Sequence, residues 1–170
     1  MPSPPARSSP DPARRIARTE SIDVDISNTQ RFLGVDAGRL AELARAVLRG
    51  EGVSEASISI ALVDDATIHR INRQHLDHDW PTDVISFVLS EPADPGLVGE
   101  LVISAEMARS TAAELSEDPD SELELYVVHG LLHLCGYDDT SDGPAAAMRE
   151  RQRDILERHG LAGSRRGLAS

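Results

Sequence analysis

The sequence predicts an α+β domain in which helices pack on a single mixed sheet of four strands. Four short segments rich in isoleucine, valine and leucine have the length and composition of strands, at residues 21–26, 57–63, 82–89 and 98–104. The last two strands follow each other through a short connection, whereas segments with helical periodicity separate the first three. Three further helical segments follow the fourth strand, and this order is typical of an α+β fold.

The length, charge and cysteine content of the chain limit its class. Its 170 residues are enough for one domain with a proper core. The formal net charge is −12, without any lysine, which argues against a general nucleic-acid binder unless arginines line a local groove. The single cysteine, Cys135, excludes an internal disulfide framework and fits a reducing compartment. We find no membrane-spanning run and no signal-peptide core, so we expect a cytoplasmic protein.

The two ends of the chain differ in composition from its centre. Residues 1–20 are rich in proline, serine, alanine and arginine without periodicity, and we expect a disordered arm there. Organelle-targeting peptides are also arginine-rich and poor in acidic residues, so that alternative stays open. Residues 21–162 are expected to form a single domain, and residues 163–170 a short, flexible basic tail.

The N-terminal half of the domain contains two strand–helix units. Residues 21–26 alternate apolar and acidic side chains, as a half-buried strand does, and residues 57–63 are rich in isoleucine, leucine and valine. The helix after each strand begins at an aspartate, which accepts hydrogen bonds from the first backbone amides. The expected helices run from Asp36 to about 49, and from Asp64 or Asp65 to about 74.

The middle of the chain is expected to supply the remaining strands. Residues 75–81 form a predicted loop, in which His75 and His78 are surface residues rather than metal ligands. Residues 91–96 contain two prolines and join the third and fourth strands as a hairpin-like connection. Ser104 suits the N-cap of the next helix, which we expect to end near residue 116.

The C-terminal part of the chain is predicted to be helical. Residues 117–120, with Pro119, are expected to form a break before an almost wholly apolar helix. After that helix a loop runs to Gly143, and Pro144 suits the first turn of a last helix that ends near Gly160.

The segment at 122–139 carries the residues with the clearest chemistry. Within it, His129 and His133 stand four residues apart, so both imidazoles lie on one face of a helix and can point at one atom. Gly136 can end the helix in a left-handed conformation, and the following turn brings back Asp139 as a third ligand. Three protein ligands leave one position for water, as in catalytic zinc sites. A hydrogen-bonded pair of core histidines is the alternative.

Two features of this segment favour the metal. The helix is apolar on nearly every side, so we expect it to be the central buried helix, where two unpaired imidazoles would be costly. Gly136 allows a turn, and the carboxylates that follow it at Asp138 and Asp139 can supply the third ligand. Zinc is the first choice for nitrogen ligands, and the carboxylate of Asp139 widens the choice toward manganese. Cys135 points to another side of the helix and is expected to be a small buried hydrophobe.

Four segments of the chain resemble one known family. HGLLHLCGYDD at 129–139 resembles HGxLHLxGYDH, the signature of the YbeY family of metal-dependent endoribonucleases. PTDVISF at 81–87 is similar to that family's PTDVLSF, and GELVIS at 99–104 is similar to its GDIVIS strand. The helix around 148–156 is similar to its closing helix. The resemblance extends over about residues 60–156 and implies an α+β fold of the kind predicted above.

The resemblance implies a zinc-dependent single-strand endoribonuclease that acts in ribosomal RNA maturation, including processing of the small-subunit rRNA 3′ end, and in ribosome biogenesis. The implied partners are single-stranded rRNA and the ribosome or its small subunit. His129, His133 and Asp139 would hold one Zn2+ and act in catalysis through it, although most relatives have histidine at the third position. Asp83 and Ser86 would line the active cleft as further catalytic-site residues.

Several positions leave alternatives open. Asp83 also suits a simple turn carboxylate. Family members usually carry arginine where this chain has Leu76, and Arg70 or Arg73 either replaces it or is solvated. Glu100 stands where the family usually has aspartate, as a base or as a surface charge.

Three other functions stay open on the sequence alone. A peptidase-like zinc hydrolase would need the glutamate that follows the first histidine in HExxH enzymes, and this chain has Gly130 there. A non-catalytic ribosome-assembly factor would hold a structural metal without turnover. A plain globular domain with a hydrogen-bonded histidine pair would bind no metal tightly.

Overall fold

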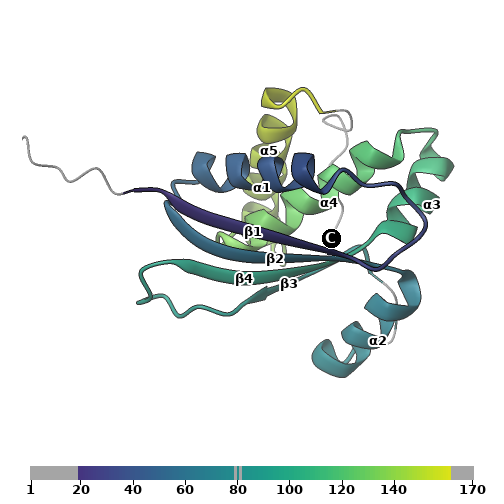
Figure 1. Ribbon diagram of the computed structural model, residues 1–170, viewed down its shortest axis with the longest axis horizontal. Coiled ribbons are helices and arrows are strands. Elements are labelled where there is room, and N and C mark those ends of the chain that lie inside the picture. The colour runs from purple at the N-terminus through teal and green to yellow at the C-terminus, as the bar shows by residue number, and fades with distance from the viewer. Residues whose placement is uncertain (1–18, 79, 81, 162–170) are drawn as a thin grey trace, which may run out of the picture.

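The computed structural model describes residues 19–78, 80 and 82–161 (Figure 1). The tail predicted at 163–170 lies outside the described residues, and so does the arm predicted at 1–20 except for its last two residues. The division of the chain into arm, domain and tail therefore stays a prediction. Among the helices of the described residues, none combines the length and apolar character that a membrane span requires.

The strands form one four-stranded sheet in the order β1-β2-β4-β3. Its strands are β1 (Ser21–Asn28), β2 (Glu55–Val63), β3 (Val84–Val88) and β4 (Leu97–Ser104). β1 pairs with β2 and β2 with β4 in parallel, whereas β3 and β4 form an antiparallel hairpin. The predicted mixed sheet is thereby confirmed, and β3 lies at one of its edges.

Within the part of the chain that the structure describes, five helices cover the two faces of the sheet unequally. They are α1 (Ala37–Gly50), α2 (Asp65–Leu76), α3 (Ala105–Leu115), α4 (Pro119–Leu134) and α5 (Asp142–Arg158). α1 and α4 lie over one face and α2 lies below the other (Figure 1). The large core fills the first layer, and a small cluster of Val63, Ile68, Ile85 and Val102 fills the second.

The predicted helix starts are confirmed where a polar side chain caps the first turn. Asp36 accepts a hydrogen bond from the Arg39 amide at 3.1 Å, and Ser104 accepts one from the Met107 amide at 3.1 Å. Of the two candidates for α2, Asp64 is the cap. Its pKa is lowered because the side chain and backbone of Thr67 both donate hydrogen bonds to the carboxylate.

Two predicted boundaries are wrong. The break expected at residues 117–120 is shorter than predicted, because Ser116 ends α3 in a left-handed conformation, Asp118 caps α4, and Pro119 already occupies the first turn of α4. Proline suits that position, since the first amides of a helix have no intrahelical partner to lose. α2 also continues to Leu76 before Asp77 ends it in a left-handed conformation with φ of 55°. His75 therefore belongs to the helix and not to a loop.

α4 lies unusually close to β3 and β4 because a glycine stands on each side of the contact. Gly130 of α4 faces the two strands, and Gly99 of β4 faces α4. A Cβ atom on Gly130 would stand 2.9 Å from Leu101 Cδ2 and 3.0 Å from Val84 Cγ2. A Cβ atom on Gly99 would stand 2.9 Å from Leu134 Cδ2. The helix is buried over nearly its whole length. The predicted central buried helix is confirmed, and its histidines are carried by a rigid element.

The close approach at Gly130 is testable by one substitution made at two glycines. Gly130→Ala and Gly38→Ala both gain helix propensity, but a Cβ atom at exposed Gly38 meets nothing closer than 3.4 Å. We expect the free energy of unfolding of Gly130→Ala to lie about 1–3 kcal/mol below that of Gly38→Ala, the cost of overpacking a core. Urea unfolding with a chelator present measures this difference. Equal values for the two variants would contradict the close approach.

Candidate metal centre

Three ligand atoms converge at the C-terminal end of α4. His129 Nε2 and His133 Nε2 are 3.1 Å apart, and Asp139 Oδ2 lies 3.4 Å from the first and 3.3 Å from the second. In a tetrahedral zinc site with bonds of about 2.0–2.1 Å, ligand atoms stand about 3.3 Å apart. The three predicted ligands are therefore brought together at the separations that a small divalent metal requires.

Local backbone structure explains this convergence. The four-residue spacing places both imidazoles on one face of α4, with their rings nearly perpendicular at 85°. Gly136 takes a φ of +100°, which ends the helix as predicted and turns the chain back on itself. The carboxylate of Asp138 accepts bonds from the amide and hydroxyl of Thr140 and so fixes the turn, and Asp139 faces the histidines.

The outer nitrogens of both imidazoles are held by oxygen acceptors. His129 Nδ1 lies 3.0 Å from Gln152 Oε1, and His133 Nδ1 lies 3.1 Å from the backbone oxygen of Tyr137. Because amide and peptide oxygens only accept hydrogen bonds, each Nδ1 donates and each Nε2 presents a lone pair. The two lone pairs face each other and the carboxylate of Asp139.

The charge state of His129 strengthens this conclusion. Its pKa is lowered by burial and by the neighbouring His133, so the ring is neutral at physiological pH. When both rings are neutral and each Nδ1 donates to its own acceptor, the two Nε2 atoms, 3.1 Å apart, have no proton to share. A cation removes the resulting repulsion, so this donor set fits a metal ion. The side chains of His129, Asp139 and His133 are 11, 19 and 26% exposed, so the centre opens toward solvent on the His133 side.

A second layer of side chains fixes the centre from α1 and α5. The hydroxyl of Tyr137 donates to Glu51 Oε2 at 2.9 Å, and Arg151 Nε donates to the other oxygen of that carboxylate. Tyr137, whose peptide oxygen accepts from His133, is therefore held through both its backbone and its side-chain hydroxyl. Gln152, next to Arg151 in α5, is 1% exposed and holds His129 directly.

Sequence reasoning missed this second layer. One signal for Gln152 was available, because it is the polar residue within the apolar stripe of Met148, Ile155 and Leu156 on α5. A polar side chain on a buried stripe needs a partner. Nothing in the local sequence indicates that the partner is His129, since the two residues belong to different helices.

The other predicted site residues lie around the centre without joining the ligand set. Asp83 accepts bonds from the Val84 amide at 2.8 Å and from the Thr82 hydroxyl at 3.2 Å, as a turn carboxylate does. Its charge acts to raise the pKa of His129, so it lies within electrostatic range. Ser86 donates to the backbone oxygen of Gly130 at 3.2 Å and ties β3 to α4 beside the first histidine. Their catalytic roles stay predictions.

Glu100 and Cys135 are not placed among the ligand atoms. Glu100 shares its face of β4 with Val102, which packs on the α2 side of the sheet, opposite α4. Burial raises the pKa of the Cys135 thiol to about 11, as expected for a small, largely buried side chain rather than a ligand. Arg70 and Arg73 are exposed on α2, and their replacement of the family arginine stays a prediction.

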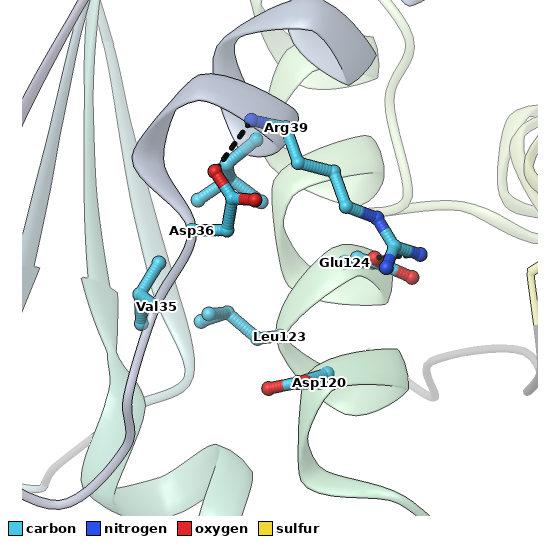
Figure 2. Close-up of a pocket in the computed structure, with 7 residues that line it drawn as sticks. Val35, Asp36, Arg39, Asp120, Leu123 and Glu124 are labelled. Carbon is cyan, nitrogen blue, oxygen red and sulfur yellow. Dashed lines mark hydrogen bonds and ion pairs between the residues drawn. The ribbon is translucent and has the colours of Figure 1, made fainter.

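A separate hollow between α1 and α4 is too small to bind a substrate. Figure 2 shows Arg39 of α1 reaching toward Glu124 of α4, and the ion pair spans 3.0 Å. Burial raises the pKa of Glu124, and Arg39 opposes that shift. The volume of about 50 Å³ suits one or two water molecules. The hollow therefore belongs to the packing of the two helices.

Comparison with known proteins gives a consistent result over most of the chain. The family model described as Endoribonuclease YbeY matches residues 25–160. The Endoribonuclease YbeY of Rhodopirellula baltica is 46% identical over 135 residues, which are 78% of this chain and 69% of that protein. The Endoribonuclease YbeY of Pelotomaculum thermopropionicum is 38% identical over an alignment of 150 residues, and the match covers 82% of this chain and 99% of that protein.

One solved structure is similar in fold. The solution structure of TM1509 from Thermotoga maritima superposes with a TM-score of 0.54 and 22% sequence identity. The match covers 84% of this chain and 95% of that one. At this identity it supports the arrangement of helices and strands alone.

The hydrogen bond from His129 to Gln152 is expected to strengthen metal binding. Gln152→Leu keeps the side-chain volume but removes the acceptor, and we expect zinc affinity to fall about 10–100-fold, the usual cost of losing such a partner. Gln152→Glu, which keeps an acceptor, is expected to retain most of the affinity. Competition with a zinc indicator dye measures both variants.

The matched control is Gln74→Leu, the same change at an exposed position of α2. It is expected to bind zinc like the unmodified chain. Unchanged affinity in Gln152→Leu would show that the acceptor does not orient His129.

Proposed function

The chain belongs to the Endoribonuclease YbeY family, and from this premise we propose that it is a hydrolase that cleaves RNA internally at the centre formed by His129, His133 and Asp139. The known role of the family is ribosomal RNA processing. The observation that carries the proposal is the convergence of three metal-ligand atoms within 3.4 Å of one another.

Zinc is the metal that we propose for this centre. Two imidazole nitrogens and one carboxylate oxygen are common zinc ligands, and three of them leave a position open. When bound, zinc supplies a Lewis acid for a phosphoryl oxygen and lowers the pKa of water. The chain itself holds both imidazoles in the tautomer that presents Nε2, through Gln152 and the Tyr137 carbonyl.

The residue after the first histidine favours RNA over peptide cleavage. In HExxH peptidases that residue is the glutamate base. Here it is Gly130, and even a Cβ atom there would overlap Leu101 and Val84. RNA cleavage requires less of the protein, because RNA carries its own 2′-hydroxyl, and the remaining needs are in-line geometry and stabilised phosphoryl charge.

The cellular setting is part of the proposal. We propose that the substrate is single-stranded rRNA, including the 3′ end of the small-subunit rRNA, and that the protein meets it on the ribosome or small subunit in the cytoplasm. The role of the family supports this setting. Asp83 and Ser86 are proposed to line the cleft beside the centre, and Ser86 supports α4 next to His129.

Cleavage of single-stranded rRNA by purified variants tests the function. We expect His133→Ala and Asp139→Ala each to lose at least about 100-fold in activity, because a missing ligand costs more than the loss of its orienting partner. A chelator is expected to abolish cleavage by the unmodified chain, and added zinc to restore it.

The matched controls are His159→Ala and Asp154→Ala, the same changes at exposed positions of the last helix and its end. They are expected to cleave like the unmodified chain. Equal cleavage by all variants would place the activity elsewhere. Zinc binding without any cleavage would favour the assembly factor with a structural metal.

A further inference from the structure

We propose that the side chains of His78 and Trp80 form a platform on which an unpaired base of the RNA substrate stacks. This inference rests on the proposed function and adds to it a contact outside the metal centre. It concerns the segment between α2 and β3, where this chain lacks the arginine usual in its family and has Leu76 instead.

The platform is flat, aromatic and open to solvent. The rings of His78 and Trp80 stack with centroids 4.5 Å apart and an angle of 13° between their planes. Trp80 is 55% exposed, although tryptophan is usually highly buried in a folded protein. Proteins that bind single-stranded RNA offer exposed aromatic faces of this kind, because every base can stack on them.

A buried residue holds the platform in place. Asn72 of α2 is 2% exposed, and its side-chain amide donates to the backbone oxygen of Trp80 at 2.8 Å. Its own backbone oxygen accepts from the His78 amide at 3.2 Å. One buried asparagine therefore fixes both stacked residues, and the aromatic face does not have to be ordered by its ligand.

Two arginines of α2 can contact the phosphate backbone of a bound RNA. The C-terminal half of α2 carries exposed Arg70 and Arg73 and has no acidic residue over 70–76, whereas Asp77 and Asp79 follow it in the sequence. The two arginines are cations on the helix before the platform that can contact RNA phosphates, in a chain whose net charge is −12. The same two arginines would also explain how the chain dispenses with the family arginine.

The platform lies within reach of the metal centre along the chain. Val84, whose side chain borders Gly130, is four residues from Trp80, so the two are at most about 14 Å apart. A single RNA strand can therefore contact both the platform and the centre. A protein ligand would also cover an exposed tryptophan, but the arginines and the family favour RNA.

Trp80 is the only tryptophan of the chain, so its fluorescence reports on the platform directly. The full-length His133→Ala variant, which is not expected to cleave, is titrated with a single-stranded RNA 12-mer and with the same sequence as a duplex. We expect saturable quenching by the single strand and little by the duplex.

Substitutions then measure the contribution of stacking. We expect Trp80→Ala to weaken binding of a labelled 12-mer about 5- to 150-fold, and Trp80→Phe to retain most of the affinity. In chains with an intact metal centre, Trp80→Ala should raise KM by a similar factor and leave kcat and zinc content unchanged. Leu115→Ala removes another exposed apolar side chain, on α3, and should change nothing.

The outcomes separate this inference from the proposed function. Cleavage by the unmodified chain with an unaltered KM in Trp80→Ala would overturn the platform and leave the function intact. Quenching without any cleavage would support the platform and contradict the function. Equal quenching by duplex RNA, or none by either RNA, would overturn the platform, and in the second case a protein ligand would be the remaining occupant.

Discussion

The close contact between α4 and the β3–β4 hairpin is the constraint on which the rest of the structure depends. Two glycines, Gly130 on the helix and Gly99 on the strand, allow a separation that any side chain at those positions would prevent. The residue before Gly130 is His129, the first candidate ligand, and the Gly130 carbonyl accepts a hydrogen bond from the Ser86 hydroxyl. Close packing of this kind is rigid, so the orientation of both imidazoles is set by the core and not by a loop.

The same packing explains why the centre suits a metal ion. A buried helix carries two histidines whose outer nitrogens are occupied by Gln152 and by the carbonyl of Tyr137. Their inner nitrogens then face each other and a carboxylate, an arrangement that costs free energy without a cation. α1 and α5 add to the rigidity through the contact of Glu51 with the Tyr137 hydroxyl and with α5. Catalytic centres require such orientation by outer residues.

Features set by neighbouring residues were predicted from the sequence, and contacts between residues far apart in the sequence were not. The convergence of His129, His133 and Asp139 was predictable because the four-residue spacing and the glycine turn before Asp139 are local geometry. Helix caps also depend on local sequence, but two consecutive aspartates left two candidates for the N-cap of α2. The structure shows that the Thr67 amide donates its hydrogen bond to Asp64. The start of α4 was predicted too late because proline both interrupts helices and occupies their first turn. Here Asp118 caps the helix, so Pro119 belongs to its first turn. The partner of Gln152 could not be predicted, since His129 lies 23 residues away on another helix.

X-ray absorption at the zinc edge, on full-length protein purified without chelators, tests the central claim most directly. The structure predicts about one zinc ion per chain, with nitrogen and oxygen neighbours at about 2.0–2.1 Å and no sulfur at about 2.3 Å. A sulfur neighbour would mean that Cys135 is a ligand and that the end of α4 is arranged differently. Absence of any stoichiometric metal would mean that the two histidines are a hydrogen-bonded core pair.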